Sequence, residues 1–91
     1  TFATMLIKEI KQALMGKTIS YYDGWNGSHD YFKIGHIQND GSCVRVFPEK
    51  GKGWGVFIPK NIIPQLLQDG EYSKSNEVER CSYKTTWKLL N

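Results

Sequence analysis

Hydrophobic side chains of residues 2–15 recur every three or four positions, which is the spacing of one face of an α-helix. Polar side chains of the same segment fall on the opposite face, and Gly16 follows directly as a residue that commonly ends helices. We therefore expect a helix over residues 2–15. Its apolar stripe would cover one face or end of a sheet, or dock on a second subunit, and the pattern does not distinguish the two.

From residue 17 onward the apolar positions alternate with a period of two, as in β-strands. Asn39-Asp40-Gly41 lies between two alternating segments and is a strong hairpin signal. Gly35 shifts the alternation of its segment, as a glycine bulge does where a strand bends. The expected strands are residues 17–22, 31–38, 42–47 and 53–58, with a long loop at 23–30.

The segment from Gly53 to Ile63 contains the most apolar of these strands. Trp54 falls on the same face as the aliphatic residues that follow it, so the alternation predicts that it lies in a strand. Pro59 removes a hydrogen-bond donor and should end that strand. Asn61 can then cap a short helix over residues 61–68, with Pro64 in its first turn.

The C-terminal part divides into a polar run at residues 70–77, which we expect to be a loop, and an alternating segment at residues 78–90. β-branched and aromatic residues favour a strand for the second segment. A helix is the alternative, and either conformation places Arg80, Lys84 and Lys88 on one face. The sum is a single α+β domain over residues 1–91: an N-terminal helix, a small, strongly bent antiparallel sheet or barrel over residues 17–68, and a C-terminal strand.

The run Gly55-Val56-Phe57-Ile58-Pro59-Lys60-Asn61-Ile62-Ile63 resembles the end of an SH3 domain. There, a Gly-x-hydrophobic-Ile/Phe-Pro-x-Asn-Tyr-Val run carries the fourth strand into a short 3₁₀ turn. Ile19-Ser20-Tyr21-Tyr22-Asp23 is similar to the Ala-Leu-Tyr-Asp-Tyr opening of that family. The resemblance covers a small part of the chain and implies an SH3-like small barrel.

The residues that bind proline-rich peptides in SH3 domains are not matched. Ile62 stands where the family has its ligand-binding tyrosine, and Ser42-Cys43-Val44 stands nearest the place of its paired tryptophans. The acidic loop that binds basic peptides is reduced to Asp23 and Asp30. The resemblance therefore supports the barrel more than the peptide groove.

Composition narrows the class of protein. The chain has 91 residues, 40% of them hydrophobic, and a net charge of +3, which is typical of one soluble domain. It has no apolar run long enough to span a bilayer and no secretory signal pattern, so we expect a cytoplasmic protein with no membrane contact. Cys43 and Cys81 are expected to be free, buried thiols, with a disulfide in an oxidising compartment as the alternative.

Catalytic motifs are missing from the sequence. The two histidines are His29, beside Asp30 in a glycine-rich segment, and His36. Ser28 and Cys43 are the only nucleophiles worth naming, and neither stands in a motif that would activate it. No spacing indicates a metal, dinucleotide or phosphate-loop site. We expect a non-enzymatic protein without metal or cofactor.

Binding of nucleic acid is the sharper hypothesis, because single-strand binders combine basic residues with exposed aromatic rings. We expect Tyr22 and Trp25 to stack on bases or insert between them. Lys50 and Lys52 would steer phosphates, and Arg80, Lys84 and Lys88 would neutralise the nucleic-acid backbone. These charges could also be merely solvated. The rival hypothesis is protein interaction, as an adaptor, an inhibitor or a homodimer, and it differs in that such an interface depends little on salt.

Overall fold

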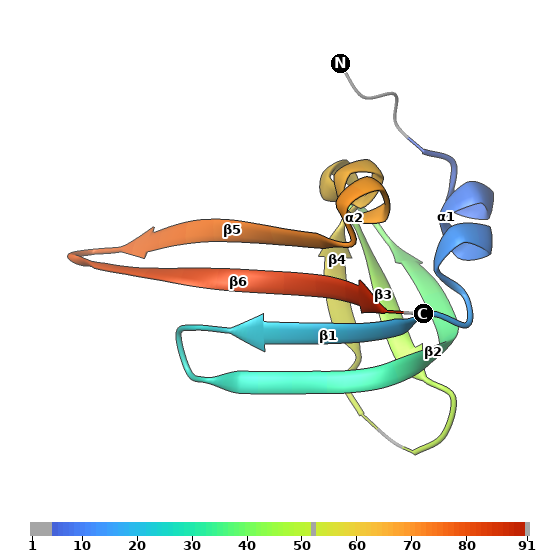
Figure 1. Cartoon of the computed structure of the whole chain (residues 1–91), viewed down its shortest axis with the longest axis horizontal. Coiled ribbons are helices and arrows are strands. Elements are labelled where there is room, and N and C mark those ends of the chain that lie inside the picture. Colours follow the sequence, from blue (N-terminus) through green and yellow to red (C-terminus); the bar gives the residue numbers. More distant parts are fainter. Residues whose placement is uncertain (1–4, 52, 91) are drawn as a thin grey trace.

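The computed structural model describes residues 5–51 and 53–90 of the chain. Two α-helices, one 3₁₀ turn and six strands follow one another along these residues (Figure 1). Their bounds are α1 (Ile7–Leu14), β1 (Thr18–Asp23), β2 (Ser28–Asp40), β3 (Cys43–Pro48), β4 (Val56–Pro59), η1 (Lys60–Ile62), α2 (Ile63–Asp69), β5 (Glu71–Val78) and β6 (Cys81–Leu90).

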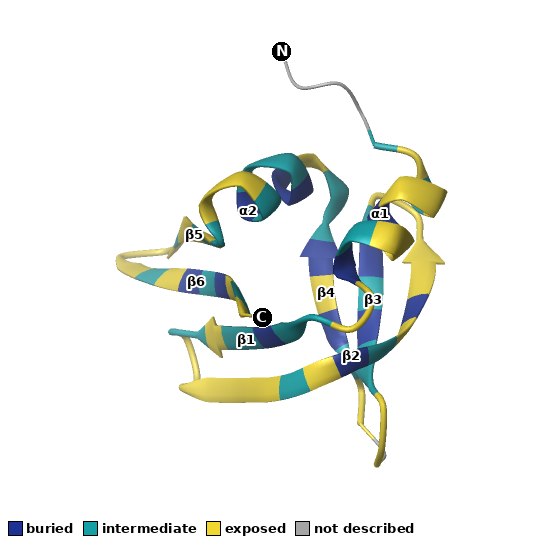
Figure 2. Ribbon diagram, turned by 45° about the vertical axis from the view of Figure 1, so that its right-hand side comes forward, coloured by how far each residue is buried: buried dark blue, intermediate teal, exposed yellow. Residues whose placement is uncertain are grey.

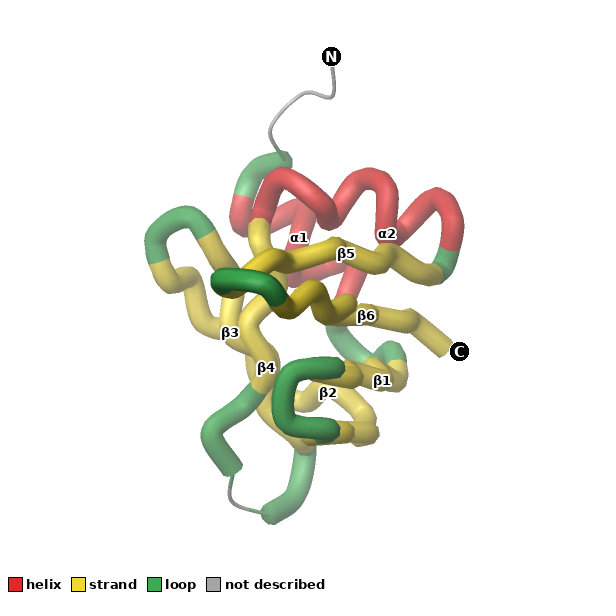
Figure 3. The backbone as a smooth tube through the Cα atoms, turned by 90° about the vertical axis from the view of Figure 1, so that its left-hand side faces the viewer, coloured by secondary structure: helices red, strands yellow, loops and turns green. Residues whose placement is uncertain are grey.

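The six strands form one antiparallel sheet in the order β4-β3-β2-β1-β6-β5. The sheet is open, with β4 and β5 at its edges. In Figure 3, β5, β6, β1 and β2 lie one below another with both helices above them. This architecture confirms the expected α+β class and the bent antiparallel sheet with an N-terminal helix.

The bend of the sheet lies in β2, which pairs with β1 along its first half and with β3 along its second half. The register shifts between Ile34 and His36, so Gly35 forms the bulge that the sequence predicts. A Cβ atom at Gly35 would collide with the backbone of Glu49, whose N–H donates to the Lys33 carbonyl at 3.2 Å. Only glycine at position 35 allows these two backbone segments to approach this closely.

The two hairpin connections beside β2 differ in how well the sequence predicts them. The Asn-Asp-Gly hairpin is confirmed: Asp40 pairs with Cys43, and Gly41 has a φ of +64°. The prediction of a long loop at residues 23–30 is wrong, because Ser28 to Asp30 already belong to β2 and pair with β1. Cross-strand hydrogen bonds to β1 compensate for the polar, glycine-rich composition of this segment.

The strand predicted from residue 53 begins only at Val56. Gly55 has a φ of +78°, and a left-handed residue interrupts the extended backbone that alternation requires. Trp54 therefore lies before the strand and is 86% exposed, whereas Val56 and Ile58 are buried as predicted. Pro59 is the last residue of β4, in agreement with the sequence.

A 3₁₀ turn and a helix follow β4, and α2 begins at Ile63 rather than at residue 61. Asn61 lies in the 3₁₀ turn and does not cap the helix, so that prediction is wrong. Pro64 occupies the first turn of α2, as expected. Gly70 ends the helix with a φ of +77°, and its N–H donates to the Leu66 carbonyl at 2.8 Å.

The polar run at residues 70–77 is not a loop, because residues 71–78 form the edge strand β5. β5 pairs with β6 along its whole length, which supplies the ladder that its composition does not indicate. The C-terminal strand is confirmed and begins at Cys81, whereas Arg80 lies in the turn before it.

The hydrophobic core lies between the bent sheet and the two helices (Figure 2). From α1, Ile10 and Leu14 are fully buried in it, which confirms that the apolar stripe of this helix covers the sheet. The helix begins at Ile7, later than predicted. Leu6 has an extended backbone, and its N–H donates to the Glu9 carboxylate at 2.9 Å. Residues 2–4 lie outside the described part of the chain.

Trp87 on β6 links the two arms of the bent sheet. Its indole N–H on β6 donates to the Phe57 carbonyl on the edge strand β4 at 3.0 Å. Its ring lies in the core, 5.7 Å from the Tyr21 ring and 6.3 Å from the Tyr72 ring. One side chain thus links β6 to β4, two strands that do not pair through their backbones.

Candidate functional site

The strands β5, β6, β1 and β2 present one of their faces to solvent, and we call it the outer face. Ile19 on β1 and Trp87 on β6 point from the opposite face into the core. Because side chains alternate along a strand, the neighbours of these residues point outward. The outer face comprises Thr18, Ser20, Tyr22, His29, Tyr31, Lys33, Glu71, Ser73, Ser75, Glu77, Ser82, Lys84, Thr86, Lys88 and Leu90.

Register places these side chains in rows across the four strands. One row is Ser73, Thr86, Tyr22 and His29, and the next is Glu71, Lys88, Ser20 and Tyr31. Residues directly opposite each other on antiparallel strands share a face and lie within side-chain contact. Aromatic, hydroxyl and cationic groups from three or four strands therefore meet on the outer face.

Two tyrosines of the outer face expose their rings. Tyr22 is 47% exposed and Tyr31 is 64% exposed. The Tyr22 ring meets the His29 imidazole edge-on, with 6.5 Å between ring centroids. Tyr22 and Tyr31 lie in adjacent rows on adjacent strands, and such diagonal positions are within reach of one extended ligand.

Three lysines and two glutamates give the outer face a modest positive charge. Lys88 pairs with Glu71, and Lys33 pairs with Glu49, each at 3.6 Å and well exposed to solvent. Exposed pairs of this kind contribute about 0–1 kcal/mol each, so either lysine can exchange its partner for a ligand. Lys84 has no carboxylate within 4.0 Å among the described residues.

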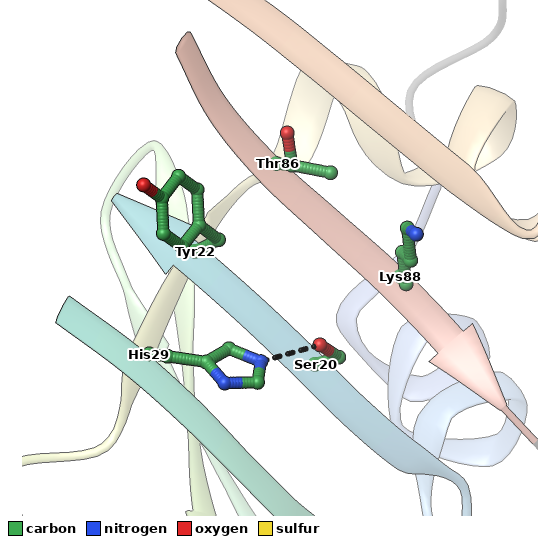
Figure 4. Close-up of a pocket in the computed structure, with 5 residues that line it drawn as sticks. All are labelled: Ser20, Tyr22, His29, Thr86 and Lys88. Atoms are coloured by element: carbon green, nitrogen blue, oxygen red, sulfur yellow. Dashed lines mark hydrogen bonds between the residues drawn. The ribbon is translucent and has the colours of Figure 1, made fainter. Parts of the chain in front are cut away.

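A shallow hollow of about 380 Å³ lies in the middle of the outer face (Figure 4). It is lined by Ser20, Tyr22, His29, Thr86 and Lys88. The Ser20 hydroxyl and the His29 Nε2 atom form a hydrogen bond of 3.0 Å, drawn as a dashed line in Figure 4. The hollow exists because the small side chains of Ser20 and Thr86 stand between larger ones.

Serine and histidine in hydrogen-bond contact are also the nucleophile and the base of many hydrolytic enzymes. Catalytic examples add a third group that orients the imidazole and donors that stabilise an oxyanion. Among the described residues, His29 has no recorded hydrogen bond other than the one to Ser20. Within the same residues no group of three or more His, Cys, Asp or Glu side chains is arranged to hold a metal ion.

Of the residues predicted to form a site, Tyr22, Lys84 and Lys88 lie together on the outer face. Trp25 does not: its ring, 56% exposed, packs on Tyr83 with 5.3 Å between centroids. Tyr83 alternates with the outward residues of β6, so Trp25 lies toward the opposite face. The Asp23 carboxylate accepts the Trp25 N–H at 3.0 Å and holds the turn in this conformation.

The remaining predicted residues lie at separate places. Lys50 is exposed in the connection between β3 and β4, outside the four strands that form the outer face. Arg80 is exposed in the turn between β5 and β6. Lys52 lies outside the described residues. The structure therefore gathers three of the seven predicted residues on one surface.

The opposite face of the same strands has different chemistry. The Tyr21 hydroxyl lies near Asp23 and Asp30, and burial together with these carboxylates raises the pKa of the Tyr21 phenol. The carboxylates of Asp23 and Asp30 thus lie on one face of β1 and β2, and Lys33, the hydroxyl of Ser20 and His29 lie on the other. This separation follows from alternation, since Asp30 and His29 are adjacent in sequence and point apart.

Sequence reasoning missed Ser20 and Lys33 as members of this surface, and it named Ser28 rather than Ser20 as the serine of interest. The signal was the alternation of residues 28–33, which becomes visible only when the loop is shortened to four residues and the register of β1 with β2 is set. The sequence predicts a loop at His29, and a residue in a loop has no neighbour fixed by strand pairing.

The cysteines are both unpaired. Cys43 is partly buried at the start of β3, whereas Cys81 is exposed at the start of β6, so the prediction that both thiols are buried is wrong for Cys81. A position beside a hairpin turn leaves Cys81 with no covering element. Neither thiol lines the hollow of the outer face.

Comparison with protein-family models, with curated proteins and with solved structures gave no match for this chain. In the described residues, no helix has the length and apolarity needed to cross a membrane.

Proposed function

We propose that the protein is a non-enzymatic binding module that holds single-stranded nucleic acid on its outer face. The observation that carries this proposal is the gathering of Tyr22, Tyr31, Lys84 and Lys88 on one exposed face of four strands. Sheet faces with exposed aromatic rings are one general solution for binding single strands, because bases that are not paired can stack on the rings.

The polar groups of the outer face suit a phosphate backbone. Lysines and the hydroxyls of serine and threonine are common donors to phosphate oxygens. Lys84 and Lys88 alternate with Thr86 and Ser82 along β6, so this strand offers a line of such donors beside Tyr22. The proposed roles are therefore stacking for Tyr22 and Tyr31 and neutralisation of phosphates for Lys84 and Lys88.

The proposal is tested by fluorescence anisotropy with a labelled, mixed-sequence single-stranded oligonucleotide at two salt concentrations. We expect affinity to fall steeply between about 50 mM and about 200 mM salt. Tyr22→Ala should weaken binding by about 1–3 kcal/mol through lost stacking. The double variant K84Q/K88Q should reduce the slope of log affinity against log salt by about 0.7 for each lysine that contacts a phosphate.

Two controls keep this test specific. The double variant K8Q/K11Q removes the same charge from the exposed side of α1 and should leave binding near the wild-type value. Trp25→Ala removes an exposed ring that packs on Tyr83 and should also bind normally. Equal weakening by both lysine pairs would show unspecific charge attraction, and no binding at low salt would refute the proposal.

Protein interaction is the second candidate, and the surface of β3 and β4 favours it. Trp54 and Phe57 are exposed there, and the Arg45 guanidinium lies 4.8 Å from the Phe57 ring centroid. Tryptophan, arginine and phenylalanine are enriched at protein interfaces. A partner or a second copy bound at this surface would show little dependence on salt and would be lost in Trp54→Ala, not in K84Q/K88Q.

We also infer that the bent sheet is an SH3-like small barrel. The support is the order of its elements: four strands joined by hairpins, a 3₁₀ turn directly after β4, and a last strand that returns to pair with β1. The helix α1 and the edge strand β5 are additions to that pattern. Two unpaired cysteines suit a reducing compartment such as the cytoplasm, where we place the protein.

A further inference from the structure

The hollow of the outer face is lined by groups that can donate hydrogen bonds or carry positive charge. Ser20 and Thr86 supply hydroxyls, Lys88 supplies an ammonium group, and His29 supplies an imidazole (Figure 4). The Thr86 hydroxyl already pairs with the Ser73 hydroxyl at 3.0 Å and can accept from it while donating its own proton elsewhere. Tyr22 forms the aromatic wall. Among the described residues, no carboxylate lines the hollow.

Because the Ser20 hydroxyl and the His29 imidazole are hydrogen-bonded, a ligand that binds Ser20 also affects which protons the imidazole carries. A serine hydroxyl has one proton, which Ser20 gives either to the His29 Nε2 atom or to a ligand. When an anion accepts that proton, Nε2 must itself carry hydrogen and donate to the Ser20 oxygen. Imidazolium satisfies this need and adds a positive charge, because both of its ring nitrogens carry hydrogen.

The charged and polar groups around His29 come from three other strands as well as from β2. The groups on the outer face around His29 are Tyr31 on β2, Tyr22 on β1, Lys84 and Lys88 on β6, and Glu71 on β5. Lys88 lies 3.6 Å from Glu71, an exposed pair that Lys88 can exchange for an anionic ligand. An anion placed between Lys88 and His29 would be attracted by both cations, so anion binding and protonation of His29 reinforce each other.

We propose that the hollow is a phosphate subsite of the outer face and that His29 binds the phosphate in its protonated form. This deepens the proposed function and rests on it. The phosphodiester lies between Lys88 and His29 and accepts from the hydroxyls of Ser20 and Thr86, while a base next to it stacks on Tyr22. Binding of nucleic acid therefore takes up a proton and strengthens as the pH falls through the titration range of histidine.

The first experiment measures oligonucleotide affinity at about pH 7.5 and about pH 5.5 at constant salt, a range in which the phosphodiester keeps its charge and histidine titrates. Affinity should rise about fivefold between these two pH values, which is the part of the roughly tenfold effect of a shift in the histidine titration by one pH unit that falls within this range. H29Q should lose most of this rise. H36Q is the matched control, since His36 is the other histidine of the chain, packs on Phe47 and should leave the rise intact.

The second experiment tests the hollow without nucleic acid. Sulfate, whose charge is constant over this range, is added while the ring signals of both histidines are followed by NMR. We expect sulfate to move the titration midpoint of His29 to higher pH and to leave that of His36 in place. The shift should shrink in Ser20→Ala, which removes the hydroxyl contact, and in Lys88→Gln.

The two experiments separate the subsite from the function. If the oligonucleotide binds but H29Q keeps the full rise, or sulfate leaves the His29 midpoint unchanged, the subsite is refuted and the proposed function stands. If sulfate moves the His29 midpoint while no oligonucleotide binds at either pH, the hollow is an oxyanion site and the nucleic-acid function is refuted.

Discussion

At the scale of single residues, Tyr21 and Tyr22 show how one step along a strand separates two environments. Tyr22 exposes its ring on the outer face beside His29, whereas Tyr21 packs on Trp87 and lies near Asp23 and Asp30. Alternation along β1 is the cause, because adjacent side chains point to opposite faces. Both residues are tyrosines, so residue type does not distinguish them. The position of each in the strand decides which ring is open to a ligand.

The raised pKa of Tyr21 leads to a prediction about stability at alkaline pH. Burial and the nearby carboxylates disfavour the Tyr21 phenolate, so the folded protein binds this proton more tightly than the unfolded chain. The stabilisation is fully present below the ordinary tyrosine pKa of 10.0 and is lost as the pH rises through the raised value. Urea unfolding of wild type and Tyr21→Phe above about pH 10 should show a shallower loss of stability in the variant. Identical slopes would contradict this.

At the scale of secondary-structure elements, β2 and β5 show two ways in which the observed strands differ from those that the composition predicts. β2 was predicted in its centre, including the bulge at Gly35, but its first residues are polar and were assigned to a loop. β5 was missed entirely, because most of its residues are polar and their order depends on pairing with β6. Edge strands often carry such composition, since charged and polar side chains discourage pairing with other chains.

Gly35→Ala tests the bulge of β2. The added methyl group would collide with the backbone of Glu49, which cannot move without disturbing its hydrogen bond to Lys33. We expect the free energy of unfolding to fall by about 1–3 kcal/mol, as measured by chemical denaturation. Gly53→Ala is the matched control, because no atom lies within 4 Å of a Cβ built at Gly53, and its effect should be close to zero. Equal effects at both positions would contradict the steric account.

At the scale of the whole molecule, the open sheet is held in its bent shape by the shared core and by the link from Trp87 to β4. Residues from both helices and from five of the strands meet in the core. The strands of the outer face continue beyond it, which leaves their hydroxyls, lysines and tyrosines on an exposed surface (Figures 1 and 2). The bend therefore encloses the core and leaves the outer face, our proposed binding surface, open to solvent.

Trp87→Phe tests this link. The phenyl ring keeps much of the apolar contact but cannot donate to the Phe57 carbonyl, which is then left without that partner in a partly buried place. We expect the free energy of unfolding to fall by about 1–3 kcal/mol in chemical denaturation. Trp25→Phe replaces an exposed indole of the same type and should cost clearly less. A larger cost at Trp25 would contradict the role given to Trp87.

The sequence by itself determined the class of the fold, because local patterns carry that information. Periods of 3.6 and two distinguish α1 from the strands, and the Asn-Asp-Gly turn and the helix end at Gly70 depend on backbone preferences of single residues. It also pointed to Tyr22, Lys84 and Lys88. Only the tertiary structure decided that Trp54 is exposed, that residues 71–78 form a strand, and that Ser20 meets His29. The strand at residues 71–78 and the contact between Ser20 and His29 depend on pairing with a neighbouring strand, and register between strands is fixed by contacts that the pattern of one segment does not contain. Trp54 is exposed because the backbone at Gly55 interrupts the strand.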